Sequence, residues 1–383
     1  MDSAPDPRQH PRPMLPRCSQ MAWLLATVLS ACFTASTAST PSTSSTTCPG
    51  TFLPSPWPEA DALFHQSDRW AGGDAAYSVD LGGGRILWLF GDTFISKTPG
   101  SGRSGAYFPH NSVGLQTGRN PAKASMAFYW GSAAGAPTSF FSGFVGSPKN
   151  WLWPLHGVRV GGRLLLFFQE IAPASDGLGF QTMGGVALGI DNPDEEPSQW
   201  RPRRLDAPSH PFGAILGAAM LVEGDSLLAV SLVEPGSHDA YLARWPLADA
   251  QAGSLASPQW WAKSSWSATT APSPLWKAGA PEVSVQARCG GYVTVQSPGF
   301  GGTTIAVATA PALTGPWSRF VPVFRPPESE RAGVLVYAAK SHPELEGAEL
   351  VVTYATNSTD LATLVGDSSL YFPRFVRLDG RRR

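Results

Sequence analysis

The sequence predicts an all-β fold, a five-bladed β-propeller with about four antiparallel strands in each blade. Three observations support this prediction. A β hairpin with a tight glycine turn recurs five times, two further candidate strands follow four of the five hairpins, and 40 Gly and 36 Pro residues disfavour long helices. Four strands per repeat are typical of a propeller blade. A β-sandwich or one long jelly roll is the alternative layout.

The first hairpin is the segment 76–94, AYSVDLGGGRILWLFGDTF. The five hairpins are aligned by their turns, which lie at Gly83, Gly161, Gly224, Gly290 and Gly347. Successive turns are 57 to 78 residues apart. This period is longer than the roughly 40 to 50 residues of familiar propeller repeats and indicates blades with long loops.

Two more strands are expected after each of the first four hairpins. The candidate pairs are 112–116 with 127–130, 186–190 with 199–204, 241–245 with 260–266, and 305–309 with 317–324. The fifth repeat has a third strand at 370–378 and then ends. We therefore expect its outer strand to come from the N-terminal segment 51–53, because that pairing closes the ring and removes exposed strand edges.

The first 50 residues are expected to lie outside the propeller, which we place at 51–379 with a short tail at 380–383. Basic residues precede the apolar segment 21–33, which is too short to span a bilayer and is typical of an export signal, placed at 1–32. The residues 33–50 are rich in Ser and Thr, as in a flexible linker.

The tetrapeptide Leu29-Ser30-Ala31-Cys32 resembles a bacterial lipobox, which would place a lipid on Cys32. The alternative is an ordinary signal peptide, and Met21 as the true start would leave no basic flank. We expect an exported protein, either a cell-envelope lipoprotein or a secreted monomer, whose contact with a membrane is limited to that anchor.

The net charge and the cysteine content indicate which classes of partner, disulfide and metal site can be expected. With 28 basic and 29 acidic residues the net charge is −1, so nothing favours nucleic acid as a partner. Cys48 and Cys289 are candidates for a disulfide in an oxidising compartment. The sequence has no Cys-x-x-Cys or His-x-x-x-His pattern, so we expect neither zinc nor another cofactor, and a calcium ion with scattered oxygen ligands stays open.

Strand direction predicts which side chains share a face. In an up-and-down blade, the start of the inner strand and the end of the second strand lie on one face, and the glycine turns lie on the other. Asp74 and Asp92 therefore share a face. The other residues expected there are His156, Glu170, Glu234, Glu282, Lys340, His342, Asn357 and the loop 95–111 with Arg103, Tyr107, His110 and Asn111. Asp74, His156, Glu282 and His342 begin inner strands and are expected to converge most closely on the central axis.

Convergent carboxylates favour glycoside hydrolysis, which needs one protonated acid and one ionised partner. In this hypothesis Asp74 is the base or nucleophile and Glu282 is the general acid. Asp92 either sets the pKa of a neighbouring catalytic carboxyl group or binds the sugar. The side chains expected to bind substrate are His156, His342, Asn111, His110, Arg103, Trp153 and Glu170. Each has a structural alternative: a turn aspartate often binds loop amides, and a buried histidine is often only hydrogen-bonded.

Several segments of the chain resemble those of a known group of proteins. The chief ones are WAGGDAAYSVDLGGGRILWLFGDTF at 70–94, WLWPLHG at 151–157, AKSHPEL at 339–345 and YFPRF at 371–375. Together they resemble a bacterial five-bladed propeller group known only as a domain of unknown function. That group is similar to arabinanase-type glycosidases, and some related proteins are endo-D-arabinanases. The resemblance covers 52–378 and implies a five-bladed fold and action on a glycan, with an arabinan-like polysaccharide or cell-wall glycan favoured.

The arabinanase-type arrangement of acids transfers only in part. Its aspartate in blade 1 would be Asp74 or Asp92, and its glutamate in a later blade would be Glu282. The third acid has no match, because blade 3 begins with Gly217-Ala218-Ala219. A noncatalytic carbohydrate-binding propeller is therefore the second hypothesis, and a protein-interaction scaffold is the third.

Overall fold

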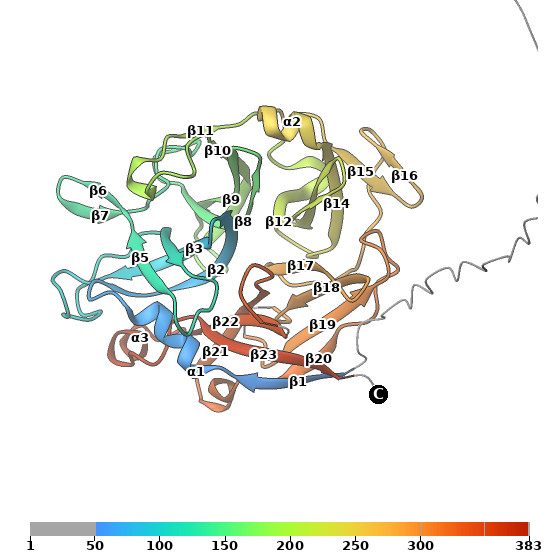
Figure 1. The fold of residues 1–383 in the computed structure, drawn as a ribbon. Coiled ribbons are helices and arrows are strands. Elements are labelled where there is room, and N and C mark those ends of the chain that lie inside the picture. Colours follow the sequence, from blue (N-terminus) through green and yellow to red (C-terminus); the bar gives the residue numbers. More distant parts are fainter. Residues whose placement is uncertain (1–50, 300, 348, 382–383) are drawn as a thin grey trace, which may run out of the picture. The chain divides into compact units, whose positions relative to one another are not determined.

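The computed structural model describes residues 51–299, 301–347 and 349–381. These residues belong to one compact unit, Ser45–Arg383, and form five antiparallel sheets arranged around a centre (Figure 1). The fold is a five-bladed β-propeller, as predicted. The predicted export signal, linker, lipid site at Cys32 and disulfide partner Cys48 lie outside the described residues.

The blades follow one another along the chain. Blade 1 contains β2 (Trp70–Gly82), β3 (Arg85–Ile95), β4 (Ser112–Thr117) and β5 (Ser125–Tyr129), and blade 2 contains β8 (Trp151–Val160), β9 (Arg163–Pro173), β10 (Phe180–Ile190) and β11 (Pro202–Arg204). Blade 3 contains β12 (Ala214–Glu223), β13 (Ser226–Val233), β14 (Ala240–Pro246), β15 (Gln259–Ala262) and β16 (Ser265–Ser267). Blade 4 contains β17 (Val283–Arg288), β18 (Gly291–Gln296), β19 (Ile305–Ala310) and β20 (Val321–Phe324).

Blade 5 closes the ring with strands from both ends of the domain. It contains β21 (Val334–Ser341), β22 (Leu350–Ser358), β23 (Arg374–Arg381) and, as its outer strand, β1 (Thr51–Pro56). β1 pairs antiparallel with β23, from Thr51 opposite Arg381 to Pro56 opposite Val376. The predicted closure by the N-terminal segment is therefore confirmed. β23 extends to Arg381, so the first two residues of the predicted tail 380–383 belong to the propeller.

Short elements connect the blades. A two-stranded hairpin of β6 (Gly131–Ala133) and β7 (Ala136–Thr138) lies between blades 1 and 2. The α-helices are α1 (Pro58–Asp61), α2 (Leu247–Ala252) and α3 (Leu361–Gly366), and the 3-10 turns are Ala62–His65, Pro197–Gln199, Pro211–Gly213 and Pro327–Glu330. In the described part of the chain no helix is long and apolar enough to cross a membrane.

Three outer strands differ from the prediction. The expected strand 260–266 is a hairpin, because the chain turns at Lys263, which has a φ of +62°, and β15 pairs with β16. The expected strand 199–204 shortens to β11, since Gln199 ends a 3-10 turn. The expected strand 317–324 shortens to β20, and the Trp317 indole instead donates to the Leu313 carbonyl at 3.1 Å.

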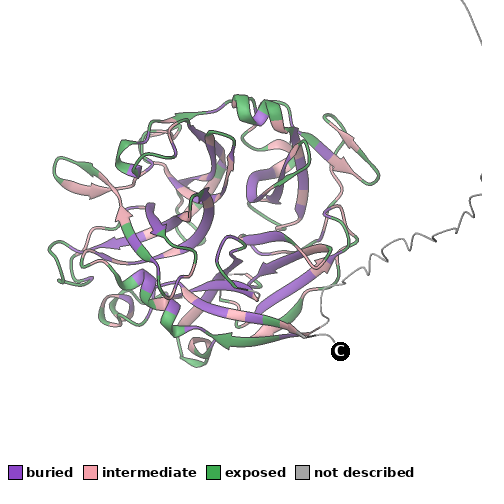
Figure 2. Cartoon of the chain, viewed as in Figure 1, coloured by how far each residue is buried: buried purple, intermediate pink, exposed green. Residues whose placement is uncertain are grey.

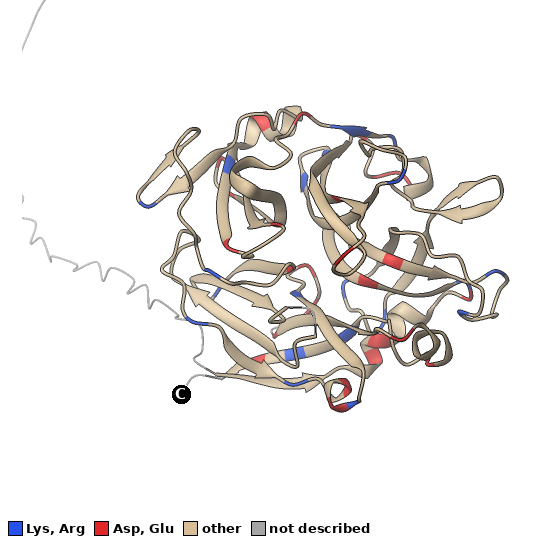
Figure 3. Ribbon diagram, turned by 180° about the vertical axis from the view of Figure 1, so that it is seen from behind, with Lys and Arg blue, Asp and Glu red and all other residues tan. Residues whose placement is uncertain are grey.

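The hydrophobic core fills the space between neighbouring blades. The second strand of each blade is covered on both faces, and β3, for example, buries Ile86 through Phe90 (Figure 2). Charged residues of both signs are interspersed around the blades in the view from behind (Figure 3).

The inner strands of blades 1, 2, 3 and 5 are interrupted by shifts in register. Register shifts occur between Pro154 and Gly157 in β8, Ile215 and Ala219 in β12, and Tyr337 and Lys340 in β21, and several occur between Trp70 and Tyr77 in β2. β-Bulges redirect side chains and often lie beside functional sites. These irregularities position the candidate site.

Candidate functional site

Asp74 and Asp92 are brought together by a bulge in blade 1. Gly73 pairs with Thr93 and Ala75 pairs with Phe90, so the single residue Asp74 lies opposite both Gly91 and Asp92. The strand direction predicted that both acids share a face, and the bulge places their charges within interaction range of each other. Both side chains keep partial exposure to solvent.

Two tyrosines bind the Asp74 carboxylate. The hydroxyl groups of Tyr337 and Tyr371 donate to Oδ2 of Asp74 at 2.7 and 3.2 Å. Asn357 donates in turn to the Tyr337 hydroxyl at 3.0 Å. Burial and the Asp74 charge raise the pKa of both tyrosines, so they remain protonated donors. Asp74 is therefore held by residues more than 260 positions away in the sequence.

Burial, together with the charges of Asp92 and Glu282, raises the pKa of Asp74 to about 8, and the tyrosine hydrogen bonds oppose this increase. Like charges confined together resist joint ionisation. At neutral pH Asp74 therefore holds a proton, which is the property required of a general acid.

Several residues beside the contact between Asp74 and the two tyrosines have a left-handed backbone conformation. Ala75 and Ala76 have φ angles of +62° and +57°, Ala338 follows Tyr337 with +58°, and Tyr371 itself has +63°. Each such residue costs about 1 to 2 kcal/mol relative to the right-handed form. Backbone strain of this kind persists where the surrounding structure enforces it, and it clusters at functional sites.

Gly91 provides the space for the Asp74 carboxylate. A Cβ atom on Gly91 would lie 2.4 Å from Oδ1 of Asp74, closer than real side chains come. The backbone there needs no positive φ, so the glycine is required by the neighbouring carboxylate and not by a turn. The Gly-Asp pair at 91–92 thus combines a spacer with an acid.

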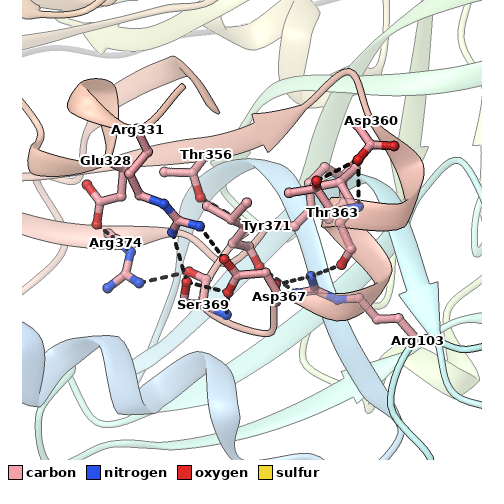
Figure 4. Close-up of polar contacts among 12 residues, drawn as sticks. Arg103, Glu328, Arg331, Thr356, Asp360, Thr363, Asp367, Ser369, Tyr371 and Arg374 are labelled. Atoms are coloured by element: carbon pink, nitrogen blue, oxygen red, sulfur yellow. Dashed lines mark hydrogen bonds and ion pairs between the residues drawn. The ribbon is translucent and has the colours of Figure 1, made fainter. Parts of the chain in front are cut away.

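Arg103 anchors the segments that carry Asp74 and Tyr371. Its guanidinium donates to the Ala71 carbonyl at 2.7 Å, to Leu364 at 2.7 Å and to Leu370 at 2.6 Å. Figure 4 shows this network, in which Tyr371 lies between Arg103 and Thr356. Because Arg103 is buried and bound to backbone, it is placed to position the site and not to contact a substrate.

Asp92 is bound by two nitrogen donors on its own side of the site. Trp153 Nε1 donates to Asp92 Oδ1 at 2.8 Å, and His110 Nδ1 lies 2.8 Å from the same oxygen. The His110 ring stacks on Trp151 at 4.4 Å, and Phe180 packs edge-on against Trp153 at 4.6 Å. These half-buried rings form an aromatic wall beside the acid, of the kind on which sugar rings stack.

Glu282 enters the site from blade 4 and forms an ion pair with Lys340 of β21. The Lys340 side chain is 1% exposed, whereas that of Glu282 is 22% exposed. Lys340 also donates to the Ala338 carbonyl at 2.9 Å and lies 4.3 Å from the centre of the Tyr77 ring. Burial lowers the pKa of Lys340 and the Glu282 charge opposes that shift, so removing either partner would leave an uncompensated charge.

The two predicted inner-strand histidines are part of the framework. His156 accepts from the Met220 amide at 2.9 Å and lies 3.0 Å from the Ser78 carbonyl, while His342 contacts the Ser78 and Thr353 hydroxyls at 2.5 and 2.7 Å. Burial lowers the pKa of both, to about 4 for His156. They line a central cavity of about 300 Å³ and not the Asp74 contact.

Two further predicted substrate binders hold loops. Asn111 is 1% exposed; its side chain exchanges hydrogen bonds with the backbone of Phe141 and donates to the Leu152 carbonyl. Glu170 accepts from the Gly146 amide and from Asn150, both at 2.6 Å. Their polar atoms are engaged within the protein, so we do not carry them into the proposed mechanism.

The sequence predicts no functional role for three tyrosines and a lysine at the site, which are Tyr77, Tyr337, Tyr371 and Lys340. It places Lys340 on the same face as Asp74 but gives it no role. Tyr371 lies inside the YFPRF segment and Lys340 inside AKSHPEL. Tyr77 lies inside the segment 70–94, and Tyr337 precedes AKSHPEL by two residues, so position was the only signal available. Among the described residues no group of three or more His, Cys, Asp and Glu side chains could hold a metal ion.

Solved structures share this fold at low sequence identity. A provisionally named hydrolase from Bacteroides ovatus matches with a TM-score of 0.65 at 18% identity, covering 85% of this chain and 90% of that one. An α-L-arabinofuranosidase from Podospora anserina has a TM-score of 0.47 at 12% identity, with 87% and 98% covered. A xylan β-1,4-xylosidase from Bacillus halodurans has a TM-score of 0.45 at 12% identity, with 81% of this chain and 53% of that one covered.

At 18% identity the likeness to the Bacteroides ovatus structure is one of fold alone. The chain spans about half the length of the xylosidase. No curated protein matches it. A family model described as a domain of unknown function, DUF5005, matches residues 59–380. The chain therefore belongs to the DUF5005 family.

Proposed function

We propose that this protein is a glycoside hydrolase that acts on a polysaccharide or cell-wall glycan, with an arabinan-like substrate favoured. The observation that carries the proposal is that Asp74, Asp92 and Glu282 lie together on one face of the propeller, which we call the Asp74 rim. Asp74 is protonated at neutral pH, and Glu282 is paired with a buried lysine. Glycoside hydrolysis requires such a division between a protonated and an ionised carboxyl group.

The contacts favour a reversal of the roles expected from the sequence. In the proposed mechanism Asp74 donates its proton to the glycosidic oxygen. Glu282, held by its ion pair with Lys340, attacks the anomeric carbon or activates a water molecule. Asp92 raises the pKa of Asp74, and the Trp153 and His110 rings beside Asp92 receive the sugar.

Export, as a lipoprotein modified on Cys32 or as a secreted protein, and a monomeric state remain part of the proposal. A glycan polymer lies outside the cytoplasm in most bacteria, so an exported hydrolase is consistent with the apolar segment 21–33.

The test is reducing-end release from a panel of arabinans, arabinogalactans and other cell-wall glycans by the domain from Thr51 onward. Asp74→Asn and Glu282→Gln are compared with Glu346→Gln, which changes an exposed acid beside the glycine turn of blade 5, on the opposite face. We expect release by the wild type and the control, and a loss of at least a thousandfold in both site variants. Equal rates in all four proteins would refute the proposal.

A noncatalytic carbohydrate-binding propeller is the second candidate. It is favoured by the backbone of blade 3, where Gly217 occupies the inner-strand position that would carry a third acid. Saturable binding of one glycan without release, unchanged in Asp74→Asn, would support this candidate over the hydrolase.

A further inference from the structure

A groove of about 750 Å³ lies between blades 3 and 4, on the face opposite to Asp74. It is bordered by the glycine turns of the two inner hairpins, β12–β13 and β17–β18. β17 separates it from Glu282 by six residues, or about 20 Å of strand. Its volume falls within the ~300 to 1,000 Å³ typical of ligand sites, and it is spatially distinct from the rim.

The groove is lined on one side by a stacked arginine and tryptophan. The Arg244 guanidinium lies 4.3 Å from the centre of the Trp266 ring, and its Nε donates to Gln259 at 3.0 Å. In the described part of the chain, the two terminal nitrogens of Arg244 have no protein hydrogen-bond partner. Trp261 packs edge-on against Trp266 at 5.5 Å, which fixes the indole in place.

The opposite wall comes from blade 4 and is polar. Arg288 and Tyr292 line it, and the Tyr292 hydroxyl donates to Glu223 across the boundary between the blades. This bond joins the two walls of the groove. The lining charges are two arginines and one glutamate, too few for a nucleic-acid backbone and suited to hydroxyl or carboxylate groups.

Blade 3 has a structural addition at this groove. The described blades otherwise have four strands, but blade 3 continues into β16, which carries Trp266. Ring closure does not require this fifth strand. Its hairpin places an indole and a planar cation beside each other, the combination that binds the apolar face and the hydroxyl edge of a sugar ring.

We propose that the groove between blades 3 and 4 is a second, noncatalytic glycan-binding site that holds a segment of polymer away from the Asp74 rim. The choice of a glycan as the ligand rests on the proposed function, whereas the assignment of the groove as a binding site rests on its own geometry. Trp266 supplies the stacking surface, and the terminal nitrogens of Arg244 donate to sugar oxygens. A polymer held at this groove increases the local concentration of chain near the protein.

The test is native affinity electrophoresis of the domain from Thr51 onward in gels containing arabinan, arabinogalactan, xylan or polygalacturonate. Binding is measured in an Asp74→Asn background, so it is read without turnover and independently of whether the protein is a hydrolase. Trp266→Ala and Arg244→Gln are compared with Trp130→Ala, which removes another arginine-stacked tryptophan, 5.7 Å from Arg69 on blade 1.

We expect the Trp266 and Arg244 variants to bind one polymer at least tenfold more weakly, and the Trp130 variant to bind it normally. Thermal melts establish that each variant is folded, and the Arg244 variant keeps the test valid should the loss of Trp266 disturb blade 3. Unchanged binding by both groove variants, or no retardation of the parent by any polymer, would overturn the proposal.

Discussion

Replacing Gly91 with alanine tests whether the position of the Asp74 carboxylate governs activity. The added Cβ would lie 2.4 Å from Oδ1, and contacts below 3.0 Å essentially do not occur. The oxygen must therefore move by at least 0.6 Å, the difference between these two distances. The alanine itself fits the backbone, because Gly91 does not have a positive φ.

The displacement disturbs the hydrogen bonds that hold Asp74. The Tyr371 bond is already 3.2 Å long and would break first, while the 2.7 Å bond from Tyr337 can stretch. Misplacement of a catalytic group by about 1 Å costs roughly a hundredfold in rate. We therefore expect kcat to fall about 10- to 100-fold with little change in KM, and overpacking to lower stability by about 1 to 3 kcal/mol.

The assay is steady-state reducing-end release by the Gly91→Ala variant on the glycan that the wild type cleaves. Gly162→Ala is the matched control, since a Cβ at that β8–β9 turn meets nothing within 4 Å and Gly162 has no positive φ. A Gly91→Ala enzyme with wild-type kcat, or one no more impaired than the control, would show that the Asp74 position does not limit the reaction.

Three further predictions follow from the burial and contacts of individual charged side chains. Asp92→Asn removes a charge that raises the pKa of Asp74. The alkaline limb of the pH–rate profile should therefore move from near pH 8 to a pH about one unit lower. A limb that does not move would exclude Asp74 as the titrating acid. Lys340→Met leaves Glu282 without its partner, so kcat should fall at least tenfold, whereas the exposed Lys263→Met should leave kcat unchanged. Burial raises the pKa of Glu344 to about 8 from an ordinary value near 4.5, so its contribution to stability is complete below pH 4.5 and is lost as the pH rises towards 8. Glu344→Gln should therefore raise the melting temperature at pH 8 relative to the wild type and leave it nearly unchanged at pH 4.5, and equal melting temperatures at both pH values would contradict this reasoning.

The repeated architecture could be predicted because it depends on local patterns. Alternating apolar residues on either side of a glycine turn define each inner hairpin, and the missing outer strand of blade 5 requires a partner from the N-terminal end. The direction of successive strands then places Asp74, Asp92 and Glu282 on one face. These inferences need only the two-residue period of a strand and the order of the strands.

The composition of the site could not be predicted in the same way. The bulge at Asp74 and the left-handed alanines at 75, 76 and 338 break the two-residue alternation, so the pattern no longer indicates which side chain points where. The outermost turns were misjudged for a related reason, since β15 and β16 are separated by a turn that the run of tryptophans conceals.

The sequence by itself determined the fold, the closure of the ring and the face on which the acids lie, because these follow from short-range patterns. Only the tertiary structure decided the contacts of those acids. It placed Tyr337 and Tyr371 on Asp74, put Lys340 beneath Glu282 and assigned His156 and His342 to the framework. The physical reason is that these contacts join residues from different blades, and their geometry depends on how the blades pack around the centre.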